Sequence, residues 1–192
     1  MQYAKDTLYV TLRDRLAALN PARTVFLDGV TRPAVIVAEN EHVTPAGPLP
    51  DAFYIRWGAV RRAQLMDGSQ HPLLALECGI SYWTAGTTGN QGVDRGRLLA
   101  ALDSELLAIC SPRQATKRDY TQSPALDLGT QVLWSAPELH LSPVRPPLPS
   151  EAAEWKLSAD LLSAGPQGTA PIVRLERTAT LTVFYFPEGS LS

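Results

Sequence analysis

The sequence has few of the features that mark secreted, metal-binding or nucleic-acid-binding proteins. Only two of its 192 residues are cysteine, Cys78 and Cys110, and they fit buried thiols in a reducing compartment better than a disulfide. The net charge is −2, so the chain lacks the basic excess that captures nucleic acid. No closely spaced ligand pair occurs, and His42, His71 and His140 lie far apart in or beside proline-containing loops. We therefore expect no metal site and no sequence-specific nucleic-acid binding.

Long hydrophobic runs are also missing. No uninterrupted apolar stretch is long enough to span a bilayer, and residues 1–6 lack the pattern of a signal peptide. We expect a protein that is made and used in the cytoplasm, or in an assembly built there, without contact with a membrane. Hydrophobic residues make up 45% of the chain and charged residues 19%, which is enough to bury a core. The length favours a single domain over residues 1–192.

Two segments have the periodicity of amphipathic helices. The first covers residues 3–19 and is ended by Asn20-Pro21, and the second covers residues 94–110. In each, apolar side chains recur at spacings of four, four and three residues, so they share one face. The positions that define the two faces are Leu8, Leu12, Leu16 and Leu19, and Leu98, Leu102, Leu106 and Ile109.

The remaining apolar segments predict strands. Residues 25–27 and 34–38 are β-formers on either side of Asp28-Gly29, which predicts a hairpin with a bulged or longer turn. Residues 53–57 and 73–83 predict two further strands, and residues 131–134 predict a short strand at best. Apolar and polar residues alternate over 155–161 and again over 173–185, which predicts a long antiparallel hairpin with one dry face. Arg177 interrupts this alternation and is interpreted as a bulge or as the point where the strand leaves the core.

These elements predict an α+β fold with two layers. An antiparallel or mixed β-sheet carries two helices packed mainly on one face, with extended proline-rich loops. Residues 39–51 and 137–149 are rich in proline, and the wider range 112–150 is expected to be an extended insertion or arm. Such segments are either surface excursions or arms that order on a partner.

The chain offers little catalytic chemistry. Gly86-x-x-Gly89-x-x-Gly92 lies between a predicted strand and helix, where backbone amides can hold a phosphate. It lacks the lysine and hydroxyl residue of a P-loop, so a flexible connector is favoured, and a small phosphate- or nucleotide-binding module is the alternative. No nucleophile elbow is present, and Cys78 lies in an apolar strand, which raises a thiol's pKa. We expect no enzymatic activity and no cofactor.

Basic and aromatic residues supply the remaining candidates for contacts. Arg61-Arg62 and Lys117-Arg118 are small basic pairs, and the former is typical of a solvated sheet edge. The four tryptophans lie in or next to predicted strands, which favours core or subunit-interface packing over stacking platforms. They are Trp57, Trp83, Trp134 and Trp155.

The order of elements resembles that of the tail terminator or tail-completion proteins of tailed bacteriophages. That order is an N-terminal helix, a hairpin, further strands, a second helix and a closing antiparallel pair. The residues that carry the resemblance are 7–16 in the first helix, 94–103 in the second and 180–186 in the final strand. The resemblance covers most of residues 1–110 and 153–187.

The resemblance implies a virion protein that forms a ring, usually of six copies, on the end of the tail tube. Its partners would be further copies of itself, the tube, and neck or head-completion proteins, and DNA would pass through the opening without sequence-specific binding. The family has no catalytic residues to carry over. Because a closed ring is built from heterologous contacts, each subunit needs two different complementary patches. The residues predicted to contribute to them are Pro45, Pro48, Arg61, Arg62, Trp134, Pro143, Arg145, Pro146 and Pro147.

Other structural functions fit the same sequence. A head-closure or neck connector, or a tube-like subunit, would also be small, rich in strands and ring-forming. A cytoplasmic adaptor that binds a partner through residues 137–149 is a further alternative.

Overall fold

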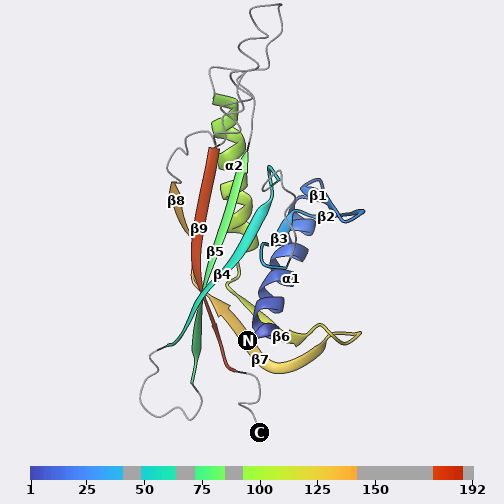
Figure 1. Ribbon diagram of the computed structural model, residues 1–192, viewed down its shortest axis with the longest axis vertical. Helices are drawn as coiled ribbons and strands as arrows, with labels where there is room; N and C mark the ends of the chain where they lie inside the picture. Colours follow the sequence, from blue (N-terminus) through green and yellow to red (C-terminus); the bar gives the residue numbers. More distant parts are fainter. Residues whose placement is uncertain (41–48, 64–71, 85–92, 142–174, 188–192) are drawn as a thin grey trace, which may run out of the picture.

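The computed structural model describes residues 1–40, 49–63, 72–84, 93–141 and 175–187. The fold is α+β: a curled, mixed sheet forms one layer and two helices form the other, as expected from the sequence (Figure 1). The seven-stranded sheet has the order β3-β4-β5-β9-β7-β6, and β8 also pairs with β9. A separate two-stranded hairpin, β1-β2, projects to one side.

The first helix, α1, spans Gln2–Leu19 and confirms the prediction from periodicity. Its buried residues are Ala4, Thr7, Leu8, Leu12 and Leu16. The backbone N–H of Asn20 still bonds to the carbonyl of Leu16, and the helix ends there, one residue before Pro21. Leu19, expected on the buried face, is 51% exposed.

The hairpin is tighter than predicted and uses other residues. β1 (Thr24–Leu27) pairs with β2 (Val30–Pro33), not with residues 34–38. Asp28 and Gly29 alone form the turn, and both have positive φ, 50° and 81°, which is the pattern of a type I′ turn. β3 (Val35–Val37) leaves the hairpin and pairs in parallel with the start of β4 (Phe53–Arg62).

The centre of the main sheet is an antiparallel pair formed by β5 (Leu74–Thr84) and β9 (Leu175–Tyr185). Their register is continuous over eleven residues of each strand, so Arg177 lies in an ordinary ladder position, and the first interpretation of this residue, a bulge, is wrong. Residues 175–178 are half-buried and full burial begins at Ala179, which agrees with the second interpretation, that the strand leaves the core near Arg177. Ala179, Leu181, Val183 and Tyr185 are buried, which confirms the predicted dry face of this strand. The predicted partner segment 155–161 lies outside the described residues.

Residues 114–141 were expected to belong to an extended insertion or arm with a short strand at 131–134, but they contribute three strands to the sheet. These are β6 (Gln114–Asp119), β7 (Leu126–Trp134) and β8 (Glu138–Leu141). β7 and β8 both pair with β9, and the break between them is at Ser135, whose Oγ accepts the backbone N–H of Thr182. Pro137, which cannot donate to a ladder, lies in this break. His140, predicted in a loop, lies in β8.

The second helix, α2, spans Val93–Ile109 and packs against β5 and β9. Leu102, Leu106 and Ile109 are buried as predicted, but Leu98 is 43% exposed and its neighbour Leu99 is buried instead. Either leucine fits the helical spacing of the buried residues. Leu99 is the buried one because it is on the side of the helix that faces the sheet. Both helices pack onto the sheet face that carries Leu76, Cys78, Ile80 and Tyr82 of β5, and one continuous core results.

We expect Leu102→Ala to lower the free energy of unfolding by about 2–5 kcal/mol, because it leaves a cavity between α2 and the sheet. Leu98→Ala, on the same helix, should cost less than about 1 kcal/mol. Urea denaturation followed by circular dichroism would measure both. Equal losses would contradict the orientation of α2 described here.

Candidate interaction surfaces

α2 is attached to the sheet by an ion pair between Asp103 and Arg177 of β9. Arg177 donates from Nη2 to Oδ2 at 2.7 Å and from Nε to Oδ1 at 3.2 Å. The hydroxyl of Tyr82 also donates to Oδ1 of Asp103, and burial raises the pKa of Tyr82, so this hydroxyl remains protonated. The two charged side chains are only 17% and 16% exposed. The arginine that interrupts the alternation of β9 is therefore a cross-layer anchor.

A second ion pair attaches the other side of α2 to the chain that follows α1. Glu105 accepts hydrogen bonds from Arg23 Nε at 2.9 Å and Arg23 Nη2 at 3.1 Å. Asn20, at the end of α1, donates its side-chain amide to the same carboxylate at 2.7 Å. Asp103 and Glu105 thus both hold α2 in place.

The C-terminal end of α2 is fixed by Arg15 of α1. Its guanidinium donates to the carbonyl oxygens of Ile109 at 3.0 Å, Pro112 at 2.7 Å and Gln114 at 3.2 Å. These include a carbonyl of the last helical turn, where a cation is favoured. The same guanidinium lies over the ring of Trp134, whose Nε1 donates to the carbonyl of Cys110 at 2.8 Å.

These attachments leave the solvent-facing side of α2 without charge over its last three turns. The exposed residues there, which we call the outer face of α2, are Ala100, Ala101, Ser104, Leu107 and Ala108. Leu107 is 44% exposed, and the Ser104 hydroxyl donates to the carbonyl of Ala100 within the helix. An exposed helix normally carries charged residues on this side. The outer face therefore resembles a contact surface more than a solvated one.

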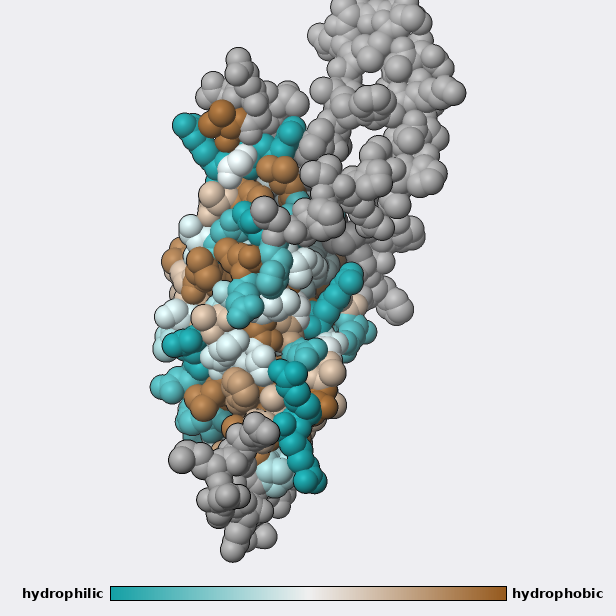
Figure 2. Space-filling model, turned by 90° about the vertical axis from the view of Figure 1, so that its left-hand side faces the viewer, coloured by the Kyte–Doolittle hydropathy of each residue, from teal (hydrophilic) through white to brown (hydrophobic). Residues whose placement is uncertain are grey.

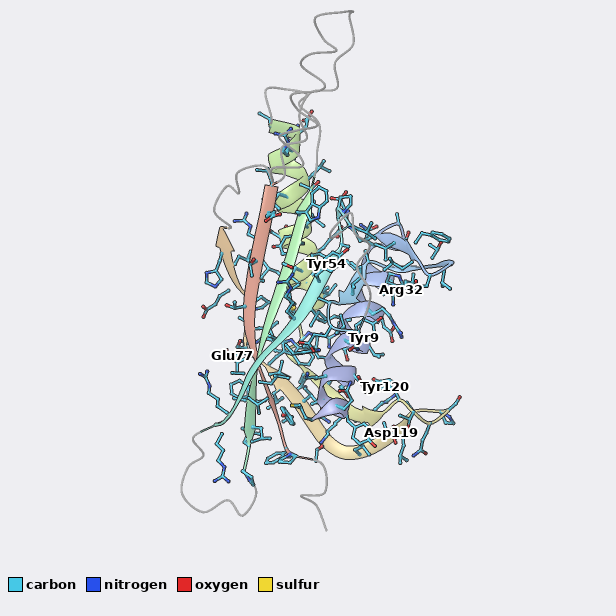
Figure 3. All side chains as sticks on the ribbon, viewed as in Figure 1. Tyr9, Arg32, Tyr54, Glu77, Asp119 and Tyr120 are labelled. Atoms are coloured by element: carbon cyan, nitrogen blue, oxygen red, sulfur yellow. The ribbon has the colours of Figure 1, made fainter. Side chains whose placement is uncertain are left out.

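The β1-β2 hairpin carries an exposed apolar side chain on each of its two faces, because the register places Phe26 opposite Thr31 and Val30 opposite Leu27. Val25 is buried against the core, but Phe26 is 69% exposed and Val30 is 58% exposed. At the base of the hairpin, Arg32 donates to the hydroxyl of Tyr9 of α1 at 3.3 Å, and Figure 3 shows these two side chains on the same side of the molecule. The hairpin is thus attached at its base and carries large apolar side chains near its turn.

The sheet face opposite the helices is more polar. On β9 it carries Thr178, Thr180 and Thr182, which alternate with the buried residues of the strand. Figure 2 looks at the side of the molecule on which β8 and β9 lie; residues of intermediate hydropathy cover much of it, and hydrophobic residues form small separate patches. This side has the character of an ordinary solvated sheet face.

The interface residues predicted from sequence are not brought together among the residues described. Arg61 and Arg62 lie inside β4 rather than after it; both are exposed, and Arg61 Nη1 is 3.4 Å from Glu77 Oε1. Trp134 is 3% exposed and belongs to the core, so its ring is not on the surface of this chain. The other predicted positions, Pro45, Pro48, Pro143, Arg145, Pro146 and Pro147, lie outside the described residues, as do Gly86–Gly92.

Neither the exposure of Phe26 nor the outer face of α2 was predicted from the sequence. Phe26 lies in a short apolar strand, and such a residue is usually assigned to the core. The outer face was detectable on a helical projection, because residues 98–111 contain only two charges and both lie towards the buried side.

The thiols of both cysteines are buried and free, as expected. Burial raises the pKa of Cys78, and it raises that of Cys110 to about 12, so neither forms the thiolate that a nucleophile requires. Within the described ranges, no group of three or more His, Cys, Asp or Glu side chains could hold a metal ion. In the same part of the chain, no helix has both the length and the hydrophobicity to cross a membrane.

Neither the models of known protein families nor the curated proteins compared with this chain give a match.

We expect Arg177→Met to lower the free energy of unfolding by about 1.5–3 kcal/mol, because it leaves the Asp103 carboxylate, whose side chain is only 16% exposed, without its cation. Arg97→Met is the matched control: Arg97 pairs with Asp94 at 3.6 Å on the exposed first turns of α2, and its loss should cost less than about 1 kcal/mol. The double variant Arg177→Met with Asp103→Asn should be less destabilised than the sum of its parts. Equal effects of Arg177→Met and Arg97→Met in urea denaturation would contradict an anchoring role for the Asp103–Arg177 pair.

Proposed function

We propose that this protein is a structural subunit of a phage tail or a phage-tail-like particle. In this role, copies of the chain form a ring, usually of six, that caps the tail tube and presents a surface to the neck or head. The protein is then part of the virion after assembly in the host cytoplasm. The proposal assigns it no catalytic residue and no cofactor.

The observation that carries the proposal is the order of elements in a single two-layer fold. An N-terminal helix, a hairpin, a run of strands and a second helix follow one another, as in the order that underlies the resemblance to tail terminators. Three further strands, β6, β7 and β8, then precede the closing strand β9. The closing strand, β9, is central in the sheet, so the elements belong to one unit.

A second line of support is the distribution of exposed apolar side chains. The β1-β2 hairpin and the outer face of α2 are different surfaces on different elements. A subunit of a closed ring needs two such unlike patches, whereas a two-fold dimer needs one patch that matches itself.

A neck connector or a tube-like subunit shares these requirements. Copy number alone does not separate the three functions, because all of them form rings. The partner does: a tail terminator binds the end of the tube, a connector binds the head-proximal components, and a tube subunit stacks on itself.

We expect the purified protein to form rings, or to remain a monomer that forms rings when tail tubes are added. Light scattering would give the mass, and negative-stain images of the same fraction would show the shape. A strict monomer that ignores tail tubes would overturn the proposal. Long stacks without added tubes would favour a tube-like subunit.

A further inference from the structure

Residues 143–149, which we call the proline arm, have the sequence of a ligand for an aromatic groove. The prolines of the arm are Pro143, Pro146, Pro147 and Pro149, and Arg145 precedes the central pair. Three of these prolines are spaced three residues apart, which is one turn of a polyproline II helix. Proline fixes φ near the value of that helix, and the carbonyl groups of the helix have no internal partners. Such peptides bind surfaces lined by aromatic side chains.

α1 carries a partly exposed aromatic surface beside its buried face. We call it the tyrosine flank, and it consists of Asp6, Tyr9 and Arg13 of α1 and of Tyr120, which follows β6. The three residues of α1 are half-buried and are spaced three and four residues apart, so they lie along one side of the helix. The Arg13 guanidinium lies 5.8 Å from the centre of the Tyr9 ring and pairs with Asp14 at 2.7 Å.

Tyr120 is held against the same helix. The backbone N–H of Arg118 donates to Oγ1 of Thr7 at 3.1 Å, which fixes the end of β6 on α1. Burial raises the pKa of Tyr120, and the charges that act on its hydroxyl are those of Arg118, Asp14, Arg13 and Asp6. Figure 3 shows Tyr9 and Tyr120 on the same side of the molecule. Both tyrosines are therefore close to Arg13 and border the same turns of α1.

The tyrosine flank has donors and an acid that are not used within the subunit. The Tyr9 hydroxyl accepts from Arg32 at 3.3 Å and keeps its own proton for an acceptor. The Tyr120 hydroxyl makes no hydrogen bond within the described part of the chain. Asp6 accepts from the side-chain amide of Gln2 at 2.7 Å and has no cationic partner among the same residues. The flank thus offers donors for peptide carbonyls and a carboxylate for an arginine.

We propose that the proline arm of one copy binds the tyrosine flank of the next copy, with its prolines against Tyr9 and Tyr120 and Arg145 directed towards Asp6. This inference rests on the proposed ring function for its partner, a second copy of the chain, and names a contact between neighbouring subunits. A preformed polyproline conformation reduces the entropy lost on binding. Each copy supplies one arm and one flank, so the contact is heterologous and can close by rotation.

The place where the arm begins argues for a neighbouring copy rather than for the same one. The arm follows β8, whose last residue, Leu141, pairs with Arg177 of β9. Figure 1 shows β8 and α1 on opposite sides of the molecule, with β9, β5 and β4 between them. Pro143 comes two residues after Leu141, which allows a reach of about 7 Å. The start of the arm therefore stays on the β8 side of its own subunit.

Peptide binding tests the inference directly. A peptide with the sequence of residues 141–150 would be titrated into the ¹⁵N-labelled full chain, and amide chemical shifts would report the site. We expect saturable shifts at Tyr9, Arg13 and Tyr120 with a Kd below about 1 mM, because a closed ring supplies effective concentrations of this order. A peptide with alanine in place of Pro146 and Pro149 is the control and should bind at least about tenfold more weakly. Absence of saturable shifts in the millimolar range would overturn the inference.

Matched variants locate the binding surface. We expect Tyr9→Ala and Tyr120→Ala each to weaken peptide binding at least about tenfold, because each removes an aromatic wall. Tyr120→Phe keeps the ring, should weaken binding about threefold, and replaces the alanine variants if circular dichroism shows them to be unfolded. Phe26→Ala, at a 69% exposed aromatic residue of the hairpin, should leave binding unchanged. Unchanged binding in the tyrosine variants, or an equal loss in Phe26→Ala, would contradict this site.

Cross-linking distinguishes an arm bound to the next copy from an arm bound to its own subunit. Cys78 and Cys110 are buried and free, so they provide a background of low reactivity. The full chain with both Leu148→Cys and Ala17→Cys would be treated with a short bismaleimide under conditions in which rings form. These positions lie near the end of the arm and one turn after Arg13 on α1. We expect a ladder of linked oligomers, and an internally linked monomer alone would overturn the inference.

The outcomes separate this inference from the proposed function. If the protein forms rings and the peptide does not bind, the ring function stands and the arm contact is wrong. If the peptide binds the tyrosine flank and no ring forms even with tail tubes, the arm contact stands and the ring function is wrong.

Discussion

The pairing of β5 with β9 is the constraint on which the rest of the fold depends. These strands occupy the middle of the sheet: β4 and β3 extend it on one side, and β7, β8 and β6 extend it on the other. Their inward-facing residues, including Leu76, Ile80, Leu181 and Val183, form the floor of the core on which the helices rest. Without this pair, neither the β3-β4 part of the sheet nor the part formed by β6, β7 and β8 would have a strand to pair with.

The helix layer shows how polar contacts inside a subunit shape its surface. Three arginines from different segments donate hydrogen bonds to α2: Arg177, Arg23 and Arg15. Together they pair with the carboxylates and a C-terminal carbonyl of the helix, which would otherwise face water. Over its last three turns, the part of α2 left exposed consists of three alanines, one serine and one leucine. The same three arginines thus stabilise the subunit and leave the outer face of α2 without charged groups.

Sequence periodicity was enough to predict α1, α2, β5 and β9, since each of them buries one regular face. It did not distinguish Leu98 from Leu99, because adjacent leucines fit the helical period equally well and only the position of the sheet decides between them. β6 and β8 were missed, and only residues 131–134 of β7 were predicted as a short strand, because these outer strands alternate weakly. Among the exposed residues, Arg61 and Arg62 were predictable from their charge. The exposure of Phe26 depends on the position of the hairpin relative to the rest of the fold, and a local sequence pattern does not specify that position.

The pairing of β5 with β9 also delays completion of the sheet during translation. β5 can pair with β9 only after β9 has been synthesised, roughly a hundred residues later in the chain. At ribosomal rates of about 5–20 residues per second, synthesis of this segment takes about 5–20 s. During that interval one edge of β5, with its buried-type residues, has no partner strand. A nascent chain in this state is prone to wrong pairing with other chains, so we expect its yield in cells to depend on translation speed and chaperone supply.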